Sequence, residues 1–160
     1  MITSVDTNIL LDILIPKTKF CLKSKQLLDE AIQKGSIIIN EVVYAELSSQ
    51  FKKYEDLEFF LEDTGVKLIP TNKKALYLAG EMWKLYFRRK KKGLQCSNCG
   101  KIQEVFCERC GTKISNRQHI ITDFIIGAFA LLQSNIFLTS RDRGFYKDYF
   151  KNLIIKTPSQ

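Results

Sequence analysis

The chain has 160 residues, of which 45% are hydrophobic, and its formal net charge is +8. This length predicts one domain built around a single hydrophobic core. The sequence has no basic N-terminal segment that leads into an apolar run with a cleavage site, and no apolar stretch long enough to span a bilayer. We therefore expect a cytoplasmic protein with no membrane partner.

The positive charge is concentrated in one segment. Between Lys84 and Arg117 there are ten Lys or Arg residues against Glu104 and Glu108, whereas the rest of the chain has 15 basic and 15 acidic residues. The whole excess of +8 therefore belongs to this segment, and such a concentration indicates a nucleic-acid partner. The alternative is a solvated helix end, which is the commonest role of a charge run.

Strands and helices alternate along the chain. Short apolar runs bounded by turn residues predict strands at 1–5, 36–40, 66–70, 136–140 and 152–158. Apolar residues at helical spacing predict helices at 8–14, 20–34, 41–53, 55–63, 72–92 and 119–133. This alternation predicts an α/β sandwich around a mostly parallel sheet.

Two Cys-x-x-Cys pairs lie inside the basic segment. They are Cys96 with Cys99 and Cys107 with Cys110, and each pair is followed by glycine. In a chain without an export signal, this spacing indicates a metal site rather than disulfides. Two such turns present four thiolates tetrahedrally to Zn²⁺, so we expect a structural zinc ribbon; iron in a rubredoxin-like site is the alternative. The metal would supply most of the ordering energy of so small a segment.

We expect this basic, cysteine-containing arm to bind RNA phosphates, and Phe106 to be available for stacking on a base. The alternative is that the ribbon only closes a loop. The predicted RNA-binding residues are Arg88, Arg89, Lys90, Lys91, Lys92, Lys101 and Arg109.

Four acidic residues stand out by their positions. Asp6 follows the first predicted strand and Asp142 the fourth, so both fall at the edge of the sheet where ligands bind in open α/β folds. Asp123 is the only formally charged residue of its apolar helix, and a carboxylate buried there needs a cation or strong donors. With Glu46, on the helix after the second strand, they indicate a divalent-cation site. Taken singly, Asp6 and Asp142 would more often be helix caps.

Four segments, in this order, resemble the PIN-domain nucleases: VDTNILLDIL at 5–14, YAEL at 44–47, HIITDFIIGAFAL at 119–131 and LTSRDRGFYKDYF at 138–150. The last two are especially similar to the VapC-type toxins of bacterial and archaeal toxin–antitoxin pairs. The resemblance implies a PIN-like three-layer sandwich formed by residues 1–88 and 117–160. Residues 89–116 would be an inserted zinc-ribbon hairpin with a basic arm.

The resemblance also implies roles for single residues. Many family members carry a further aspartate two positions after the fourth acid, where this chain has Gly144. His119 is not included in the catalytic set, because a lone histidine before an apolar helix is more often a helix-terminal or core residue. The family's catalytic, metal-binding acids match Asp6, Glu46, Asp123 and Asp142, and its supporting polar residues match Asn8 and Ser140.

The function implied by the resemblance is that of a Mg²⁺- or Mn²⁺-dependent endoribonuclease, the toxin of a toxin–antitoxin pair. Carboxylates holding such an ion neutralise the phosphate and lower the pKa of a bound water, so we expect 5′-phosphate and 3′-hydroxyl ends. An antitoxin partner and a homodimer are implied in the same way. One alternative is a ribosomal-RNA processing PIN nuclease, although its ribbon follows the PIN domain. The other is a non-catalytic RNA-binding or scaffold protein, against which the four acids argue.

Overall fold

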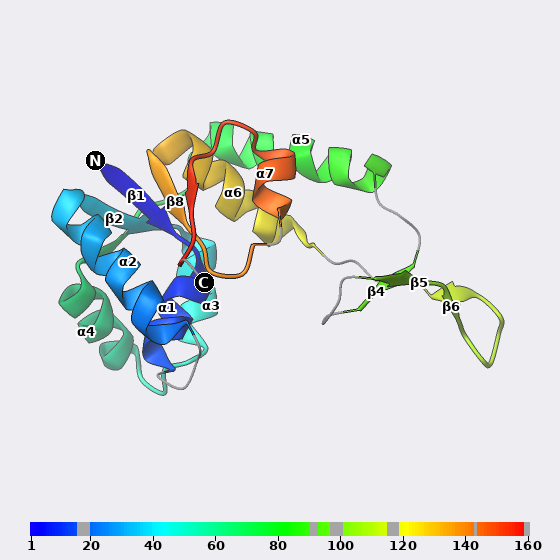
Figure 1. Ribbon diagram of the computed structural model, residues 1–160, viewed down its shortest axis with the longest axis horizontal. Coiled ribbons are helices and arrows are strands. Elements are labelled where there is room, and N and C mark those ends of the chain that lie inside the picture. The colour runs from blue at the N-terminus through cyan, green and yellow to red at the C-terminus, as the bar shows by residue number, and fades with distance from the viewer. Residues whose placement is uncertain (16–19, 90–92, 97–100, 115–118, 143, 159–160) are drawn as a thin grey trace.

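The computed structural model describes residues 1–15, 20–89, 93–96, 101–114, 119–142 and 144–158 (Figure 1). Its centre is a five-stranded sheet in the order β3-β2-β1-β8-β9, and all four neighbouring pairs are parallel. The α/β class with a parallel central sheet, predicted from the sequence, is therefore confirmed. The strands of this sheet are β1 Ile2–Val5, β2 Ser36–Ile39, β3 Val66–Leu68, β8 Ile136–Leu138 and β9 Ile155–Lys156.

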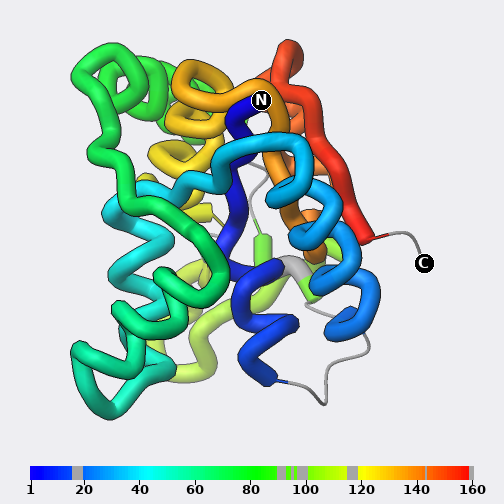
Figure 2. Tube along the Cα trace, turned by 90° about the vertical axis from the view of Figure 1, so that its left-hand side faces the viewer, coloured from blue at the N-terminus to red at the C-terminus, as the bar shows by residue number. Residues whose placement is uncertain are grey.

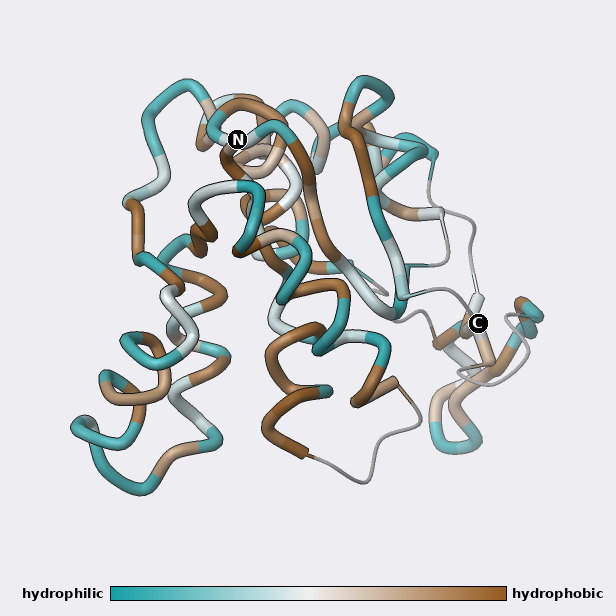
Figure 3. Tube along the Cα trace, turned by 60° about the vertical axis from the view of Figure 1, so that its left-hand side comes forward, coloured by the Kyte–Doolittle hydropathy of each residue, from teal (hydrophilic) through white to brown (hydrophobic). Residues whose placement is uncertain are grey.

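Helices shield both faces of this sheet. The consecutive residues Thr3, Ser4 and Val5 of β1 are all buried, although successive side chains of a strand point to opposite faces. Both faces must therefore be covered, as parallel sheets require. Figure 2 shows β1, the blue segment that runs from the N-terminus, between helices on either side, and Figure 3 shows hydrophilic, teal segments on many outer turns of the helices.

The observed helices follow the predicted ranges closely, with two differences. The predicted helix 41–53 ends at Ser48, where the hydroxyls of Ser48 and Ser49 donate to the carbonyl oxygens of Ala45 and Glu46 and so compete with the helical pattern. The last helix of the chain was not predicted. The helices are α1 Thr7–Leu14, α2 Cys21–Lys34, α3 Glu41–Ser48, α4 Tyr54–Thr64, α5 Lys73–Arg89, α6 Ile121–Gln133 and α7 Phe145–Tyr149. None of the helices in the described ranges is both long and apolar enough to cross a membrane.

A close contact brings the C-terminal part of the chain onto α6. Gly127 lies in the buried stretch of α6, and a Cβ atom at this position would stand only 2.3 Å from Cε2 of Phe150. Glycine therefore allows the ring of Phe150 to pack directly against the backbone of the helix. This contact holds the segment that follows β8, with Asp142, beside the helix that carries Asp123.

The segment between α5 and α6 contains two short antiparallel hairpins. β4 Leu94–Gln95 pairs with β5 Ile102–Gln103, and β6 Val105–Phe106 pairs with β7 Lys113–Ile114. Figure 1 shows β4, β5 and β6 beyond the C-terminal end of α5, away from the central sheet. The predicted junction near residue 117 lies outside the described residues, and the boundaries of an inserted unit stay a prediction.

Candidate active site

Asp6 lies at the point where β1 ends, beside the neighbouring strand β8. Its backbone N–H donates to the carbonyl oxygen of Leu138 at 2.8 Å, and its side chain is buried, with 5% of the residue exposed. Oδ2 accepts hydrogen bonds from the Thr139 hydroxyl at 2.7 Å and from Nδ2 of Asn8 at 3.1 Å. Asn8, which the resemblance matches to a supporting polar residue, therefore contacts this acid.

The electrostatic setting of Asp6 is unfavourable for an isolated negative charge. Burial raises the pKa of Asp6, and the negative charges of Glu46 and Asp123 raise it further. The hydrogen bonds from Thr139 and Asn8 oppose this effect, because they favour the ionised form. A bound cation would offset both the cost of burying the charged carboxylate and its repulsion by Glu46 and Asp123.

Glu46 is placed by a contact between helices. It lies on the exposed side of α3, and the hydroxyl of the buried Thr7, at the start of α1, donates a hydrogen bond to Oε2 of Glu46. Thr7 directly follows Asp6 in the chain. The contact therefore holds the glutamate next to the strand end that carries the aspartate.

Asp123 lies in the first turn of α6, and the expectation that it is buried is wrong. Its side chain is 33% exposed, and Oδ2 accepts a hydrogen bond from the backbone N–H of Ile120 at 2.9 Å. Nδ1 of His119 lies 3.4 Å from the same oxygen. The first turn of the helix reaches solvent, and continuous burial begins only around Ile126 to Ala130. The apolar composition of the helix did not indicate this difference. Asp123 therefore caps its helix end and needs no cation to be tolerated there.

Asp142 also serves a local structural purpose. Its Oδ1 accepts hydrogen bonds from the backbone N–H groups of Gly144 at 3.2 Å and Tyr146 at 3.3 Å, so it stabilises the start of α7. Capping and a place in a site are compatible, because a carboxylate has several acceptor positions.

The four predicted acids converge near one buried side chain, Tyr146. This tyrosine is 6% exposed, and its pKa is raised well above the usual value, first by burial and then by the charges of all four acids. Within the described ranges, no three His, Cys, Asp or Glu side chains stand close enough together to hold one metal ion. The acids share one region of the molecule without forming a ligand shell as they stand. The four are Asp6, Glu46, Asp123 and Asp142.

Thr139 contacts Asp6 but was not singled out from the sequence, whereas its neighbour Ser140 was. Among the described residues, the hydroxyl of Ser140, predicted to support the site, is buried without a hydrogen-bond partner, whereas that of Thr139 contacts Asp6 directly. The adjacency of β8 and β1 explains this contact, since Val5 pairs with Leu138 and the next residues lie side by side. Thr139 could have been found only by first placing these two strands next to each other.

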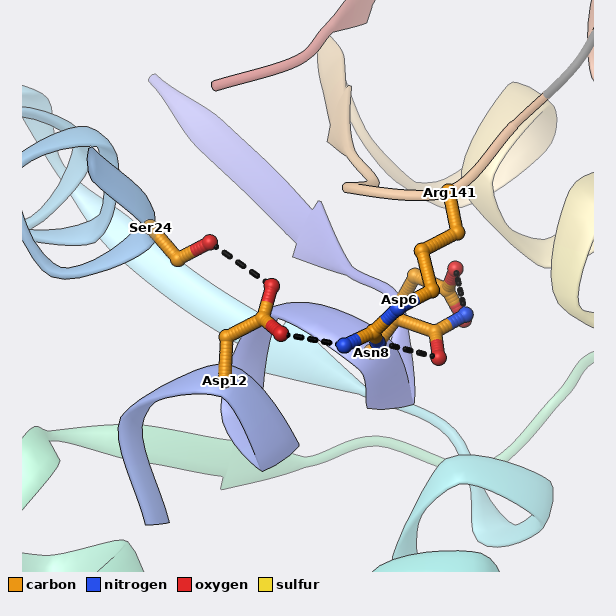
Figure 4. A network of polar contacts seen from close by, with 5 residues as sticks. All are labelled: Asp6, Asn8, Asp12, Ser24 and Arg141. Carbon is orange, nitrogen blue, oxygen red and sulfur yellow. Dashed lines mark hydrogen bonds and ion pairs between the residues drawn. The ribbon is translucent and has the colours of Figure 1, made fainter. Parts of the chain in front are cut away.

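The positively charged side chain of Arg141 extends the polar network around Asp6. Arg141 donates from Nη1 to Oδ1 of Asn8 at 2.9 Å and from Nη2 to Oδ1 of Asp12 at 2.5 Å. Asp12 is fully buried and also accepts from the Ser24 hydroxyl at 2.9 Å. Figure 4 shows this chain of contacts, with the guanidinium of Arg141 between Asp12 and Asn8.

The first cysteine of each pair makes the same kind of local hydrogen bond. The N–H of Cys96 donates to the carbonyl oxygen of Lys101 at 2.9 Å, and the N–H of Cys107 donates to that of Thr112 at 2.8 Å, five residues further on in each case. In the second turn Gly111 has φ +68°, a conformation that favours glycine.

The thiol of Cys110 is close to the Thr112 hydroxyl, at 3.4 Å. Hydrogen bonds with the side chain and backbone of Thr112, and then with Cys107, lower the pKa of the Cys110 thiol. Cys99 lies outside the described residues, so the predicted four-thiolate group is not seen as a whole.

The basic residues predicted to bind RNA fall on and beyond the end of α5. Arg88 and Arg89 are exposed in its last turn, and Lys101 and Arg109 are exposed in the hairpin segment. Phe106 is also exposed there, as base stacking would require. Lys90, Lys91 and Lys92 lie outside the described residues.

Comparison with known proteins agrees with this fold. The sequence pattern of the PIN domain matches residues 4–151. The chain therefore belongs to the PIN-domain family. Among solved structures 23 chains match, and one of them is from VapBC2 of Rickettsia felis, bound to a DNA fragment from its promoter. That match has a TM-score of 0.62 and 20% sequence identity, and it covers 99% of this chain and 100% of the other. No curated protein matches the chain.

Proposed function

We propose that this protein is a metal-dependent endoribonuclease that hydrolyses RNA phosphodiester bonds. PIN domains are typically metal-dependent nucleases. The observation that carries the proposal is the convergence of four carboxylates near the buried Tyr146, at the edge of the sheet where β1 and β8 end. The catalytic, metal-binding residues would be Asp6, Glu46, Asp123 and Asp142, with Mg²⁺ or Mn²⁺ as the cofactor.

The residues present suit a hard divalent cation. Carboxylate oxygens are the ligands that Mg²⁺ and Mn²⁺ prefer. Asp6 is buried beside Glu46 and Asp123, which makes its own negative charge unfavourable in the absence of a cation. When bound, the metal would neutralise the phosphate and lower the pKa of the attacking water.

Hydrogen bonds within the protein would orient the carboxylates of Asp6 and Glu46. Thr139 and Asn8 fix Oδ2 of Asp6, and Thr7 fixes Oε2 of Glu46, so both carboxylates are held before any ligand arrives. Glu46 is exposed and suited to bind a metal or to orient the attacking water. Ser140 would support the site with its buried hydroxyl. The expected products carry 5′-phosphate and 3′-hydroxyl ends.

The proposal is tested by cleavage of end-labelled structured and single-stranded RNAs with Mg²⁺, with Mn²⁺ and with EDTA. The wild type should cut in either metal and not in EDTA, and Asp6→Asn should not cut. Asp29→Asn, an exposed acid on α2, is the matched control and should cut as the wild type does. RNA that binds but stays intact in every condition would refute the nuclease.

The biological role that we propose is that of a toxin. The Rickettsia felis neighbour comes from a VapBC2 complex, and by analogy we propose a protein antitoxin that covers the acidic site, and a homodimer. Expression of the wild type alone should arrest growth, whereas Asp6→Asn should not, and a protein encoded by a neighbouring short reading frame should restore growth. RNA cleavage without growth arrest would point instead to RNA processing.

We propose further that residues 89–116 are an insert in a PIN domain formed by 1–88 and 117–160. Cys96, Cys99, Cys107 and Cys110 would hold one structural Zn²⁺. The equivalent backbone hydrogen bonds donated by Cys96 and Cys107 support two equivalent metal-binding turns. The lowered pKa of the Cys110 thiol favours the thiolate that a metal requires. Thiols stay reduced in the cytoplasm, where we place the protein.

The arm around this zinc would bind the RNA backbone. The proposed contacts are ion pairs with phosphates, and the exposed ring of Phe106 is available for stacking on a base. The residues that would make the ion pairs are Arg88, Arg89, Lys90, Lys91, Lys92, Lys101 and Arg109.

A further inference from the structure

The geometry points to Arg141 as a positioning residue that acts on Asp6 through Asn8. Arg141 comes from the segment between β8 and α7, and it joins that segment to α1 through Asn8 and Asp12. This inference rests on the proposed function, since it concerns how the metal-binding carboxylate is held.

Arg141 fixes which end of the Asn8 amide faces Asp6. An asparagine side chain has an accepting oxygen and a donating nitrogen, and it can be turned either way. Because Nη1 of Arg141 donates to Oδ1 of Asn8 at 2.9 Å, the nitrogen Nδ2 must face the other way, where it lies 3.1 Å from Oδ2 of Asp6. Without the arginine, Asn8 would be free to turn its oxygen towards the carboxylate, which would repel it.

Arg141 is itself held by a buried acid. Asp12 is fully buried, accepts from Nη2 of Arg141 at 2.5 Å and is fixed from α2 by the Ser24 hydroxyl at 2.9 Å (Figure 4). The guanidinium also lies over the ring of Phe20, 5.9 Å from its centroid. A planar fork can serve two acceptors at once, which a lysine ammonium at the end of a shorter, flexible chain does less well.

The consequence for Asp6 is a defined orientation. Both side-chain donors, Asn8 and Thr139, meet the carboxylate at Oδ2. Among the described residues no hydrogen bond reaches Oδ1, so this oxygen is the one that remains for a cation. The charge of Arg141 is largely balanced by Asp12, which favours a positioning role over direct binding of a phosphate.

The test measures Mn²⁺ binding to the whole protein without RNA, by the loss of the free-ion signal in electron paramagnetic resonance. Arg141→Met and Asn8→Ala should each weaken Mn²⁺ affinity about 10- to 100-fold, the usual effect of removing a residue that orients a metal ligand. The double variant should bind no more weakly than Asn8→Ala, because the arginine acts through the asparagine. Additive losses, or an Arg141→Met variant with wild-type affinity, would overturn the inference.

A second variant separates positioning from stability. Arg141→Met alone leaves Asp12 buried without its cation and is expected to lower the melting temperature. Asp12→Leu combined with Arg141→Met replaces the pair by apolar side chains, which should restore the melting temperature while Mn²⁺ affinity stays low. An affinity that recovers together with the melting temperature would assign Arg141 a purely structural role.

The outcomes also separate this inference from the proposed function. A wild type that binds Mn²⁺ but cuts no RNA would refute the nuclease and leave the positioning role standing. A wild type that cuts RNA, with an Arg141→Met variant that loses RNA affinity but keeps Mn²⁺ affinity, would make Arg141 a phosphate-binding residue instead. A wild type that binds no Mn²⁺ would overturn both.

Discussion

The hydroxyl of Thr139 donates a 2.7 Å hydrogen bond to Oδ2 of Asp6, across the ends of the neighbouring strands β8 and β1. Thr139 is fully buried, so this bond is sheltered from solvent. It lowers the pKa of Asp6 against the opposing effect of burial, and so favours the ionised carboxylate that a cation requires.

Removal of this hydroxyl should therefore impair catalysis. We expect Thr139→Val to lower the rate of RNA cleavage by about 10- to 100-fold, because Asp6 loses a donor that orients it. Thr139→Ser keeps the donor and is the matched control. The rates are compared at saturating RNA and a fixed, subsaturating Mn²⁺ concentration. Equal rates for Thr139→Val and the wild type would show that the bond does not serve the site.

Asp6 should also lower the stability of the metal-free protein. Since its pKa is raised on folding, the native carboxyl holds its proton more tightly than the unfolded one, and stability is lost as pH rises from below 3.8 through the raised folded value. At pH 7 in EDTA, Asp6→Asn should have the larger free energy of unfolding, by about 1.4 kcal/mol for each unit of pKa increase.

This difference is measured by urea unfolding of both proteins between pH 3 and pH 7, so that effects of other groups cancel. The two curves should approach each other below the ordinary pKa of 3.8, where the wild-type carboxyl is protonated in both states. A wild type more stable than Asp6→Asn at pH 7 without metal would contradict the electrostatic account of this site.

Metal removal should affect the arm and spare the sheet. We expect one Zn²⁺ per chain in protein purified under reducing conditions, measured by elemental analysis, and much less in Cys110→Ser. Chelation should expose the backbone amides of 101–114 to hydrogen exchange, because the metal supplies most of their ordering energy. Cys21→Ser, on α2 outside the arm, should keep its zinc. Stoichiometric iron would identify the alternative site, and a metal-free wild type would refute both.

Neutralising the basic arm should weaken RNA binding in a salt-dependent way. With Arg88, Arg89 and Lys90 to Lys92 all changed to Gln, the slope of log K against log salt for single-stranded RNA should fall by about 0.7 for each phosphate that the arm no longer neutralises. Lys23→Gln with Lys25→Gln removes two exposed charges from α2 and is the control. An unchanged slope in the arm variant would reject the arm as an RNA-binding surface.

Much of the fold is encoded locally and could be predicted. Each strand of the sheet is a short apolar run closed by turn residues, and both faces of β1 and β2 are buried as such runs indicate. Asp6 could be placed at the sheet edge because it directly follows the first run. The helix α7 was missed because its five residues, Phe145–Tyr149, are too few to display a helical period.

The site was harder to predict from the sequence than the fold, because its contacts join distant parts of the chain. Arg141 and Asp12 are 129 residues apart in sequence, and Thr139 and Asp6 are 133 apart. These pairs meet only because β8 lies next to β1, which no local pattern states. The burial of Asp123 was also predicted wrongly. The apolar composition of a helix does not reveal which of its turns reaches solvent, because that depends on how the helix packs in the fold.

The most direct measurement of the central claim is the single-turnover rate of RNA cleavage by Asp123→Asn across a range of Mn²⁺ concentrations. The amide still accepts the hydrogen bond from Ile120, so the helix start and the melting temperature should be kept. If Asp6, Glu46, Asp123 and Asp142 act as one metal site, the rate should fall at least about 100-fold at every Mn²⁺ concentration. A rate close to that of the wild type would mean that Asp123 only caps its helix, and would contradict the four-carboxylate site.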